Sequence, residues 1–489
     1  LLLQGALRFL LPQQVRWHLS RSSLRLATTG ARQARKERKM DNMAEKSPLL
    51  ERKLTKSIKF AYAMGHVFND LAAAMWFSYT LIYLQRVVLL EPIIAGALLL
   101  LGQIVDALMT PVFGYLVDHY SQKKIWHVIG SVMVTLTFPM IFGGFSNTSS
   151  VMAMLLYICS ISVFQTGWAA VQISHLSMIP SLTSSSLART DLTAIRYSAQ
   201  VGAAVVVFIV TWIILPAQEE TMVRLDQQDV FKFRNIVLIL TLIGVTTTVL
   251  FHIFLKSAHL REQEMGSARK PNVEEVRSLA EFSPRRTTTS NRRAWLGTTL
   301  LLRAAMLYVA SRLFITLATV YLPLYIEESD VDGKEALATV PLVSYLSSFV
   351  AALLLKYINK SWGTKVCYLI GALIGILSAV ITEFAGNTAG VVYSVAALIG
   401  AGSSITMVTA LSVTAELIGT RTERSAIVYS IVTFLDKVVT GLVVVAIERW
   451  RCDDPQFCPH YNRDMMALVC AASMMLGLLT LLSVSRCLN

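Results

Sequence analysis

The chain of 489 residues is 54% hydrophobic and only 15% charged, whereas soluble domains carry about 25% charged residues. This composition excludes a large soluble enzyme. The formal net charge of +13 does not indicate nucleic-acid binding, because residues 1–39 alone contribute +8 from nine Arg/Lys and one acid. The remaining positive charge lies mostly in short connections between apolar stretches, as expected for a protein that crosses a membrane many times.

Residues 1–57 are predicted to form a cytoplasmic N-terminal tail. Residues 1–39 leave two alternatives open: translated sequence upstream of a start at Met40 or Met43, or an Arg-rich, acid-poor organelle transit peptide. Neither alternative contributes to the membrane-spanning part of the chain.

The same tail contains a candidate sorting signal. Glu45 lies four residues before the pair Leu49 and Leu50, which fits the acidic dileucine pattern. The motif lies just ahead of the first apolar stretch, where a clathrin adaptor could reach it. We expect the adaptor to be a partner that binds this signal.

The rest of the chain contains repeated apolar stretches of about 20 residues, each long enough to cross the roughly 30 Å of a bilayer's hydrocarbon. The fold class predicted is an all-α polytopic membrane protein with about twelve transmembrane helices. The helices are expected at 58–86, 93–118, 124–145, 151–178, 190–216, 234–257, 297–326, 335–358, 364–386, 389–418, 423–448 and 465–487.

The pattern of connections divides the helices into two halves. The polar, Ser/Thr/Arg-rich segment 258–296 is predicted to be a cytoplasmic linker between an N-terminal six-helix half, 58–257, and a C-terminal half, 297–489. A weak internal repeat supports two parallel halves, since AIRYS at 194–198 corresponds to AIVYS at 426–430.

Charge in the connections predicts the orientation. Alternate connections are rich in Lys and Arg, so both termini are expected to be cytoplasmic by the positive-inside rule. On the opposite, lumenal side, Asn147 begins the glycosylation sequon Asn-Thr-Ser. Cys452 and Cys458 flank a short polar loop on that side, and the pair is a candidate for a disulfide in an oxidising lumen.

Ionisable residues within apolar helices are the strongest chemical signal, because each would cost several kcal/mol if it faced lipid unpaired. Three acids and three bases balance, so we expect them to pair across a central cavity. Some of these pairs, Arg312 with Asp436 above all, are candidates for structural ion pairs that only hold helices together. The six residues are Asp70, Asp106, Arg196, Arg312, Asp436 and Lys437.

Polar neighbours extend this set. Asn69 precedes Asp70, His66 lies one turn earlier, and Gln172 and His175 lie in the predicted fourth helix. These side chains are expected to line a hydrated cavity near the middle of the membrane. His66 and His175 are candidate proton carriers or hydrogen-bonded packing residues.

The second predicted helix contains a family motif. Residues 106–118 read DALMTPVFGYLVD and are followed by Lys123 and Lys124. This segment resembles the major facilitator superfamily, whose second-to-third loop carries a Gly, here Gly114, an Asp, here Asp118, and a basic cluster. It is most similar to the glycoside–pentoside–hexuronide cation symporter branch, in which the helix-two pattern is Asp-Ala-x-x-Asp-Pro-x-x-Gly.

Two departures from that branch bear on the coupled ion. Thr110 stands where the pattern has its second acid, and Gln172 stands where the sodium symporters have an Asp. Asp106 is then left as the cation-side carboxylate, with Thr110 beside it. Since a Na⁺ cage needs several oxygen ligands and compensating charge, we expect coupling to a proton at Asp106 in place of coupling to Na⁺.

The resemblance extends over nearly the whole chain from about residue 57. The segments that carry it read YAMGHVFNDL at 62–71, QISHLS at 172–177, LTAIRY at 192–197 and FLDKV at 434–438. They are similar to a major facilitator family of lysosomal and melanosomal membrane proteins that are needed for cysteine import into those organelles.

That resemblance implies a transporter which moves cysteine from the cytosol into the lysosome or melanosome by alternating access, with symport as the branch's coupling mode. It places Asp70 and Lys437 among the substrate-binding residues, with Arg196 as a second cation for the substrate carboxylate. Gln172, Asn69 and His66 complete the expected site.

The alternative is a lipid-moving or non-transporting interaction protein on the same fold. No metal-ligand spacing, nucleophile motif or phosphate-binding glycine loop occurs in the sequence. We therefore expect no enzymatic activity, no cofactor, no metal and no nucleic-acid partner. The partners expected are a small zwitterionic amino acid, the lipid bilayer and the clathrin adaptor.

Overall fold

The computed structural model describes residues 55–120, 122–144, 151–183, 186–215, 225–255, 291–386, 388–418, 425–452 and 457–485. Within these ranges all regular elements are helical. The prediction of an all-α polytopic fold is confirmed. Most of the predicted linker 258–296 and nearly all of the predicted tail 1–57 lie outside the described residues.

The first predicted span, 58–86, consists of three consecutive helical segments. They are α3 (Lys56–Met64), α4 (Val67–Ile82) and the π-helical turn η1 (Tyr83–Val87). Single π-turns and breaks within a helix often mark functional positions. The break at Gly65 and His66 brings the polar residues of this span close to three neighbouring helices.

Five further helices complete what we call the N-terminal half, α3 to α9. Asp226 and Asp229 form a capping box at the short 3₁₀ turn η2 (Gln227–Asp229), which begins the last of them. The five helices are α5 (Pro92–Tyr120), α6 (Lys123–Phe142), α7 (Val151–Leu182), α8 (Ser186–Ile214) and α9 (Val230–Phe254).

The C-terminal half consists of α12 to α16. Its long helix α13 (Ala336–Phe384) contains both of the spans predicted at 335–358 and 364–386, with a break at Gly363, whose φ is +78°. That left-handed backbone suits glycine. The other elements are α12 (Asn291–Ser329), the turn η3 (Gly333–Glu335), α14 (Ala389–Ile418), α15 (Ser425–Arg449) and α16 (Tyr461–Ser485).

Ten helical segments within the described ranges are long and apolar enough to cross a membrane. The two remaining predicted spans are the broken first one and α15, which carries Asp436 and Lys437. Large apolar side chains such as Leu136, Leu242 and Phe384 are exposed along the helices. Such surfaces are expected where lipid takes the place of water.

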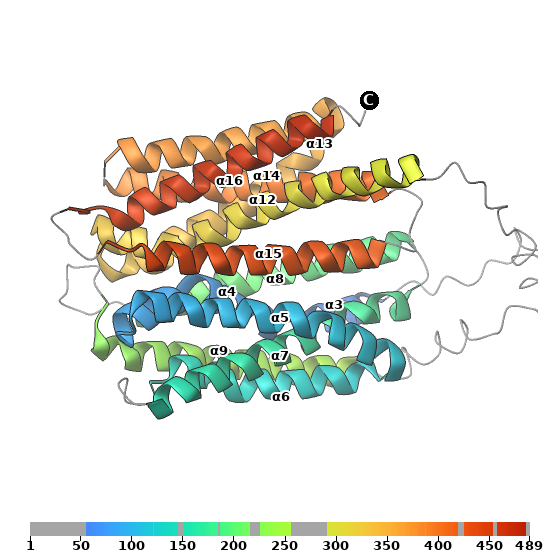
Figure 1. The fold of residues 1–489 in the computed structure, drawn as a ribbon. Helices are drawn as coiled ribbons and strands as arrows, with labels where there is room; N and C mark the ends of the chain where they lie inside the picture. The colour runs from blue at the N-terminus through green and yellow to red at the C-terminus, as the bar shows by residue number, and fades with distance from the viewer. Residues whose placement is uncertain are drawn as a thin grey trace, which may run out of the picture. The chain divides into compact units, whose positions relative to one another are not determined.

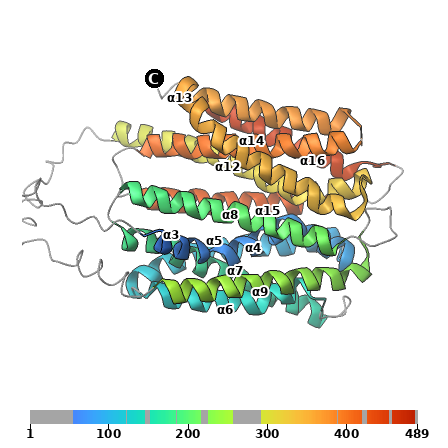
Figure 2. The same cartoon turned by 180° about the vertical axis from the view of Figure 1, so that it is seen from behind.

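The two halves pack against each other through α4 with α12, α5 with α15, and α8 with α13. In Figure 1, α15 runs beside α5, and the view from behind in Figure 2 shows α8 on the side of the N-terminal half that faces the C-terminal half. Gly441 permits the close approach of α15 to α5, since a Cβ there would lie 2.5 Å from Leu100.

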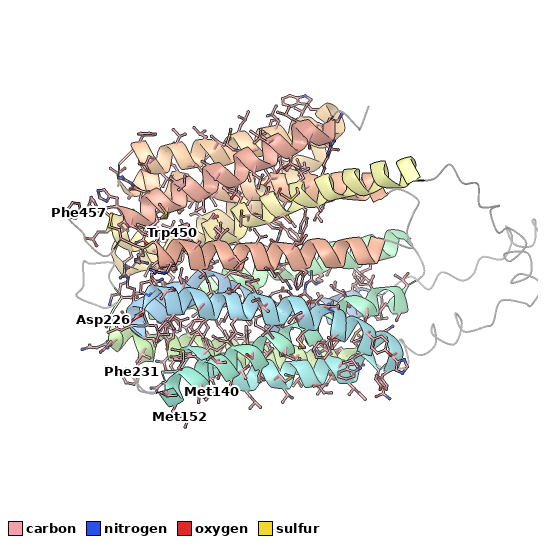
Figure 3. The ribbon with its side chains drawn as sticks, in the orientation of Figure 1. Met140, Met152, Asp226, Phe231, Trp450 and Phe457 are labelled. Atoms are coloured by element: carbon pink, nitrogen blue, oxygen red, sulfur yellow. A yellow bond between two sulfur atoms is a disulfide. The ribbon has the colours of Figure 1, made fainter. Side chains whose placement is uncertain are left out.

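One end of the bundle is marked by Cys452 and Cys458, which form a disulfide. We call it the disulfide end. Asp226, Trp450 and Phe457 lie there, at the left of Figure 3. α3 begins, and α9 and α16 end, at the opposite end (Figure 1).

Candidate functional site

The site begins at the break in the first span. His175 of α7 bonds through Nε2 to the Tyr62 carbonyl at 2.8 Å, and His127 of α6 bonds through Nε2 to the Gly65 carbonyl at 2.7 Å. Only glycine fits at position 65, because a Cβ would lie 2.6 Å from Phe251. Backbone carbonyls at the break thus bind side chains of neighbouring helices.

His66 and Asp70 lie immediately after the break. His66 Nδ1 is 2.9 Å from Asp70 Oδ1, and Arg196 Nη2 of α8 is 3.2 Å from His66 Nε2. Arg196 Nη2 is also 3.3 Å from His66 Nδ1, so the guanidinium contacts both ring nitrogens and is not aligned with one of them. The acid and the base expected to pair across the cavity are therefore joined through an imidazole, within the N-terminal half.

Two oxygens beside this group have no hydrogen-bond partner, although both are buried: Asp70 Oδ2 and Asn69 Oδ1. Asn69 uses its amide nitrogen to donate to the Trp168 carbonyl at 3.4 Å. Buried acceptors without donors cost roughly 1–3 kcal/mol each. Such groups need an explanation, and a transported ion or substrate is one.

Gln172 is only half-buried and lies on α7. Its Oε1 accepts from the indole Nε1 of Trp168 at 3.1 Å. The Trp168 ring packs edge-on against Phe77 of α4. The Gln172 carbonyl, at the position where the sodium symporters have a carboxylate, is therefore hydrogen-bonded within α7.

Asp106 and Lys437 form an ion pair between α5 and α15, and hence between the two halves. Both side chains are nearly buried, at 11% and 12% exposed. Thr110 lies one turn after Asp106, and its hydroxyl donates to the Asp106 backbone carbonyl at 2.8 Å and lies 3.3 Å from Oδ1. The sequence assigned Lys437 to the substrate and Asp106 to the coupled cation, and in the structure the two side chains are in direct contact.

Asp436 precedes Lys437 on α15 but has a partner within its own half. Arg312 Nε of α12 donates to Asp436 Oδ2 at 3.1 Å. The Asp436 side chain is 3% exposed, and its Oδ1 has no hydrogen-bond partner. Of the three pairings expected across a central cavity, only that of Asp106 with Lys437 connects the halves.

Further polar contacts join the halves at the disulfide end. Arg86 Nε is 2.5 Å from Glu327 Oε2, Lys334 Nζ is 3.0 Å from Asp229 Oδ2, and Tyr79 donates to the Leu337 carbonyl at 2.9 Å. We call these three contacts, together with the group described next, the disulfide-end contacts.

Glu448 is the centre of that group. It accepts from Gln85 Nε2 of the N-terminal half at 2.9 Å and from Tyr321 at 2.8 Å, and it pairs with Arg451 at 3.0 Å. Arg451 also donates to Gln85. Arg451 lies in the connection 449–463, on the side predicted to be lumenal, and its charge is paired with that of the buried Glu448.

Several predicted residues take no part in these groups. Gly114 has no atom within 4 Å of the position that a Cβ would occupy, so no packing requirement explains it. The side chain of Asp118 lies outside the described residues, as do Asn147 and the sorting residues Glu45, Leu49 and Leu50.

An apolar hollow of about 400 Å³ lies between α5 and α7, lined by residues that include Ile94, Leu98 and Ile158. Its walls carry almost no polar surface. It therefore does not suit a charged small molecule, and we place the candidate site at the charged groups.

Comparison with known proteins identifies the family. Residues 61–448 match the model of the MFS/sugar transport proteins. The chain belongs to this family of the major facilitator superfamily. A human relative, major facilitator superfamily domain-containing protein 12, is 37% identical over 81% of this chain and 85% of its own length. The mouse protein of the same name is 38% identical over 81% and 86%.

The fold agrees with the family. The fold is similar to that of a D-xylose–proton symporter, with a TM-score of 0.66 and 12% sequence identity. The superposition includes 88% of this chain and 96% of the symporter chain. The protein is thus a multi-pass membrane transporter of the major facilitator superfamily, as predicted.

Sequence reasoning missed several charged or titratable residues of the site. His127 and His252 lie within apolar helices, and Glu448 lies at the end of one. Ionisable residues at membrane depth are functional candidates by default, so this signal was present in the sequence. The sequence did not indicate Gln85 and Arg86, the partners of Glu448 and Glu327, because polar residues at the end of a predicted span are ordinary.

Proposed function

We propose that this transporter imports cysteine from the cytosol into the lysosome or melanosome by alternating access, coupled to protons. The observation that carries the proposal is the Asp106–Lys437 ion pair between the two halves. In an alternating-access cycle the halves move relative to each other, so a pair that joins them must break and re-form.

The pair favours a zwitterionic substrate. A free α-amino acid that inserts between the two side chains gives its carboxylate to Lys437 and its ammonium to Asp106, so both charges keep a partner. An anion or a cation would leave one of them unpaired, at a cost of roughly 3–5 kcal/mol for a buried charge. Lys437 thus keeps the role expected from sequence, and Asp106 joins it as a substrate residue.

This arrangement leaves Asp70 for the proton. Asp70 is buried, hydrogen-bonded to His66, and has one oxygen without a partner. One carboxylate is sufficient for a proton, whereas Na⁺ needs several oxygens. The choice of cysteine among amino acids rests on the family resemblance of the sequence segments and not on the site geometry.

We place the disulfide end in the organelle lumen, with both termini in the cytosol. The Lys/Arg distribution supports this orientation. The disulfide-end contacts would then close the lumenal side, as a state that loads substrate from the cytosol requires.

The location is tested by the dileucine motif. We expect Leu49→Ala with Leu50→Ala to move the protein to the plasma membrane, because adaptor pockets bind the paired leucines. Surface biotinylation measures the change, and Leu2→Ala with Leu3→Ala, at the far end of the tail, is the matched control. Unchanged lysosomal residence would contradict the assignment.

The function is tested with purified protein in liposomes and L-[³⁵S]cysteine, with and without a pH gradient. We expect saturable uptake that responds to the gradient and is competed by unlabelled cysteine. Uptake equal to that of empty liposomes would contradict cysteine transport. Fluorescent-lipid transbilayer movement in the same vesicles would then support the lipid-moving alternative.

A further inference from the structure

Four histidines from four helical elements lie in a row around the break in the first span. His66 and His175 have ring centroids 5.3 Å apart, His175 and His127 6.1 Å, and His127 and His252 5.0 Å. His66, His127 and His175 are 3% exposed or less, and His252 is only half-buried. This histidine row runs from Asp70 to the end of α9, opposite the disulfide end.

The backbone fixes the tautomers of two of these rings. A carbonyl oxygen can only accept, so His127 and His175 must each carry a hydrogen on Nε2 to bond the carbonyls of Gly65 and Tyr62. In the neutral ring the other nitrogen, Nδ1, is then a bare acceptor. His127 Nδ1 lies 3.1 Å from His252 Nε2, which donates to it.

His175 Nδ1 has no hydrogen-bond partner, although the residue is completely buried. A purely structural ring at this position would leave that acceptor unpaired at a cost of roughly 1–3 kcal/mol. The Tyr62 ring stacks on His175 with centroids 4.2 Å apart, and this packing would be equally good with an apolar ring. A bare, buried imidazole nitrogen between two other imidazoles is suited to receive a proton.

The charges around the row favour passage of a proton over its retention. Lys124 of α6 donates to the His252 carbonyl at 3.2 Å, and Arg196 of α8 lies beside His66 at the other end. Asp70 is the acid in contact with the row. Two cations oppose a stable imidazolium, while the carboxylate at one end supplies or takes up the proton.

We propose that the histidine row is the path by which the coupled proton moves between Asp70 and the cytosolic end of α9. This rests on the proposed function being proton-coupled transport. The proton leaves Asp70 through His66, is accepted at His175 Nδ1, and passes through His127 and His252 to water. At His175 and His127 the Nε2–H stays on its carbonyl, so each of these rings takes up the proton on Nδ1 and releases the same proton from Nδ1, with a single water connecting adjacent rings. His252, in its Nδ1–H tautomer, then takes up the proton on Nε2 and releases its Nδ1 proton to water, which leaves the observed hydrogen bond from His252 Nε2 to His127 Nδ1.

Glutamine variants test the row while keeping its backbone contacts. At position 175 the glutamine amide N–H replaces the imidazole Nε2–H toward the Tyr62 carbonyl, and at position 252 it replaces the Nε2–H toward His127 Nδ1. Glutamine does not carry a proton. We use His175→Gln and His252→Gln in liposomes with enclosed pyranine as the pH reporter and L-[³⁵S]cysteine outside. The liposomes contain unlabelled cysteine for the exchange assay and no cysteine for the accumulation assay. His119→Gln is the matched control, because His119 is exposed at the end of α5 and outside the row.

We expect both variants to exchange labelled for unlabelled cysteine at no less than half the wild-type rate. Accumulation driven by a pH gradient, and the accompanying pyranine signal, should fall at least tenfold. His119→Gln should match the wild type in both assays. The half-buried position of His252 keeps this test valid if the buried His175→Gln protein is not recovered from the membrane.

Three outcomes would overturn the proposal. Gradient-driven accumulation at the wild-type level in both variants would show that protons take another route. Equal loss of exchange and accumulation in His252→Gln would show a structural role. A wild-type protein that exchanges no cysteine would contradict the proposed function and the histidine row together, whereas the first two outcomes contradict the row alone.

Discussion

Asp436 and Lys437 are adjacent on α15, yet their partners lie in different halves of the molecule. Asp436 binds Arg312 of the same half, and Lys437 binds Asp106 of the other half. Successive residues of an α-helix point about 100° apart, so one residue faces its own bundle and its neighbour faces the interface. A pair within one half moves as a unit during transport, whereas a pair between halves must break.

The comparison makes different predictions for the two pairs. Loss of the Arg312–Asp436 pair, which we call the inner pair, should reduce the amount of protein. Loss of the Asp106–Lys437 pair between the halves should reduce transport. Lys437→Met should show the largest effect. We expect cysteine uptake to fall about 100-fold, roughly 3 kcal/mol, because the substrate carboxylate loses its cation. Abundance at the membrane, measured by quantitative immunoblotting beside uptake, should stay within twofold of the wild type, because Asp106 loses its cation in the wild type too each time the halves separate.

Lys437→Arg keeps the charge and serves as the control for this change. The planar guanidinium differs in shape from the ammonium, so we expect partial uptake between that of Lys437→Met and the wild type. A Lys437→Met protein with normal uptake would remove Lys437 from the site.

Arg312→Met tests the inner pair. Leaving Asp436 buried without its cation costs about 3–5 kcal/mol, so we expect abundance to fall several-fold. Uptake per molecule should remain near that of the wild type. Arg312→Met combined with Asp436→Leu should restore abundance, because removal of a whole buried pair is often neutral. Normal abundance of the single variant would show that the inner pair is not structural.

Arg86→Gln tests whether the disulfide-end contacts hold the halves together at that end. Arg86 is partly exposed, so we expect only a severalfold increase in opening. Opening is measured with a reporter cysteine, Leu100→Cys, placed where α5 meets Gly441 of α15. The rate at which maleimide labels this cysteine is compared with and without Arg86→Gln. Arg303→Gln is the control, because Arg303 bonds the Ser483 carbonyl within the C-terminal half. Equal labelling in both variants would contradict this role for Arg86.

Replacing Na⁺ by choline should have the smallest effect, less than twofold on cysteine uptake. Thr110 and Gln172 supply neutral oxygens where the sodium symporters have carboxylates, so a Na⁺ ion beside Asp106 would lack the compensating charge of those acids. A tenfold fall of uptake in choline would show that a Na⁺ site forms in another state of the cycle.

The sequence by itself determined the fold class, because about 20 apolar residues in a row have only one common solution in a bilayer, a spanning helix. It also identified Asp70, Asp106, Arg196, Arg312, Asp436 and Lys437, since charges inside such helices are costly enough to stand out. The family followed from motifs such as DALMTPVFG, and the charge count of the connections gave the expected orientation.

The sequence named Arg312 with Asp436 as a candidate ion pair, which the structure contains, but only the tertiary structure decided that Lys437 pairs with Asp106 and that Asp70 contacts His66. Pairing depends on the rotation of each helix about its axis, and a rotation of one residue changes the partner, as Asp436 and Lys437 show. The break at Gly65 was not apparent either, because the imidazoles that bond the carbonyls at this break lie on α6 and α7. Contacts between residues more than 100 positions apart are set by packing, which no local pattern in the sequence encodes.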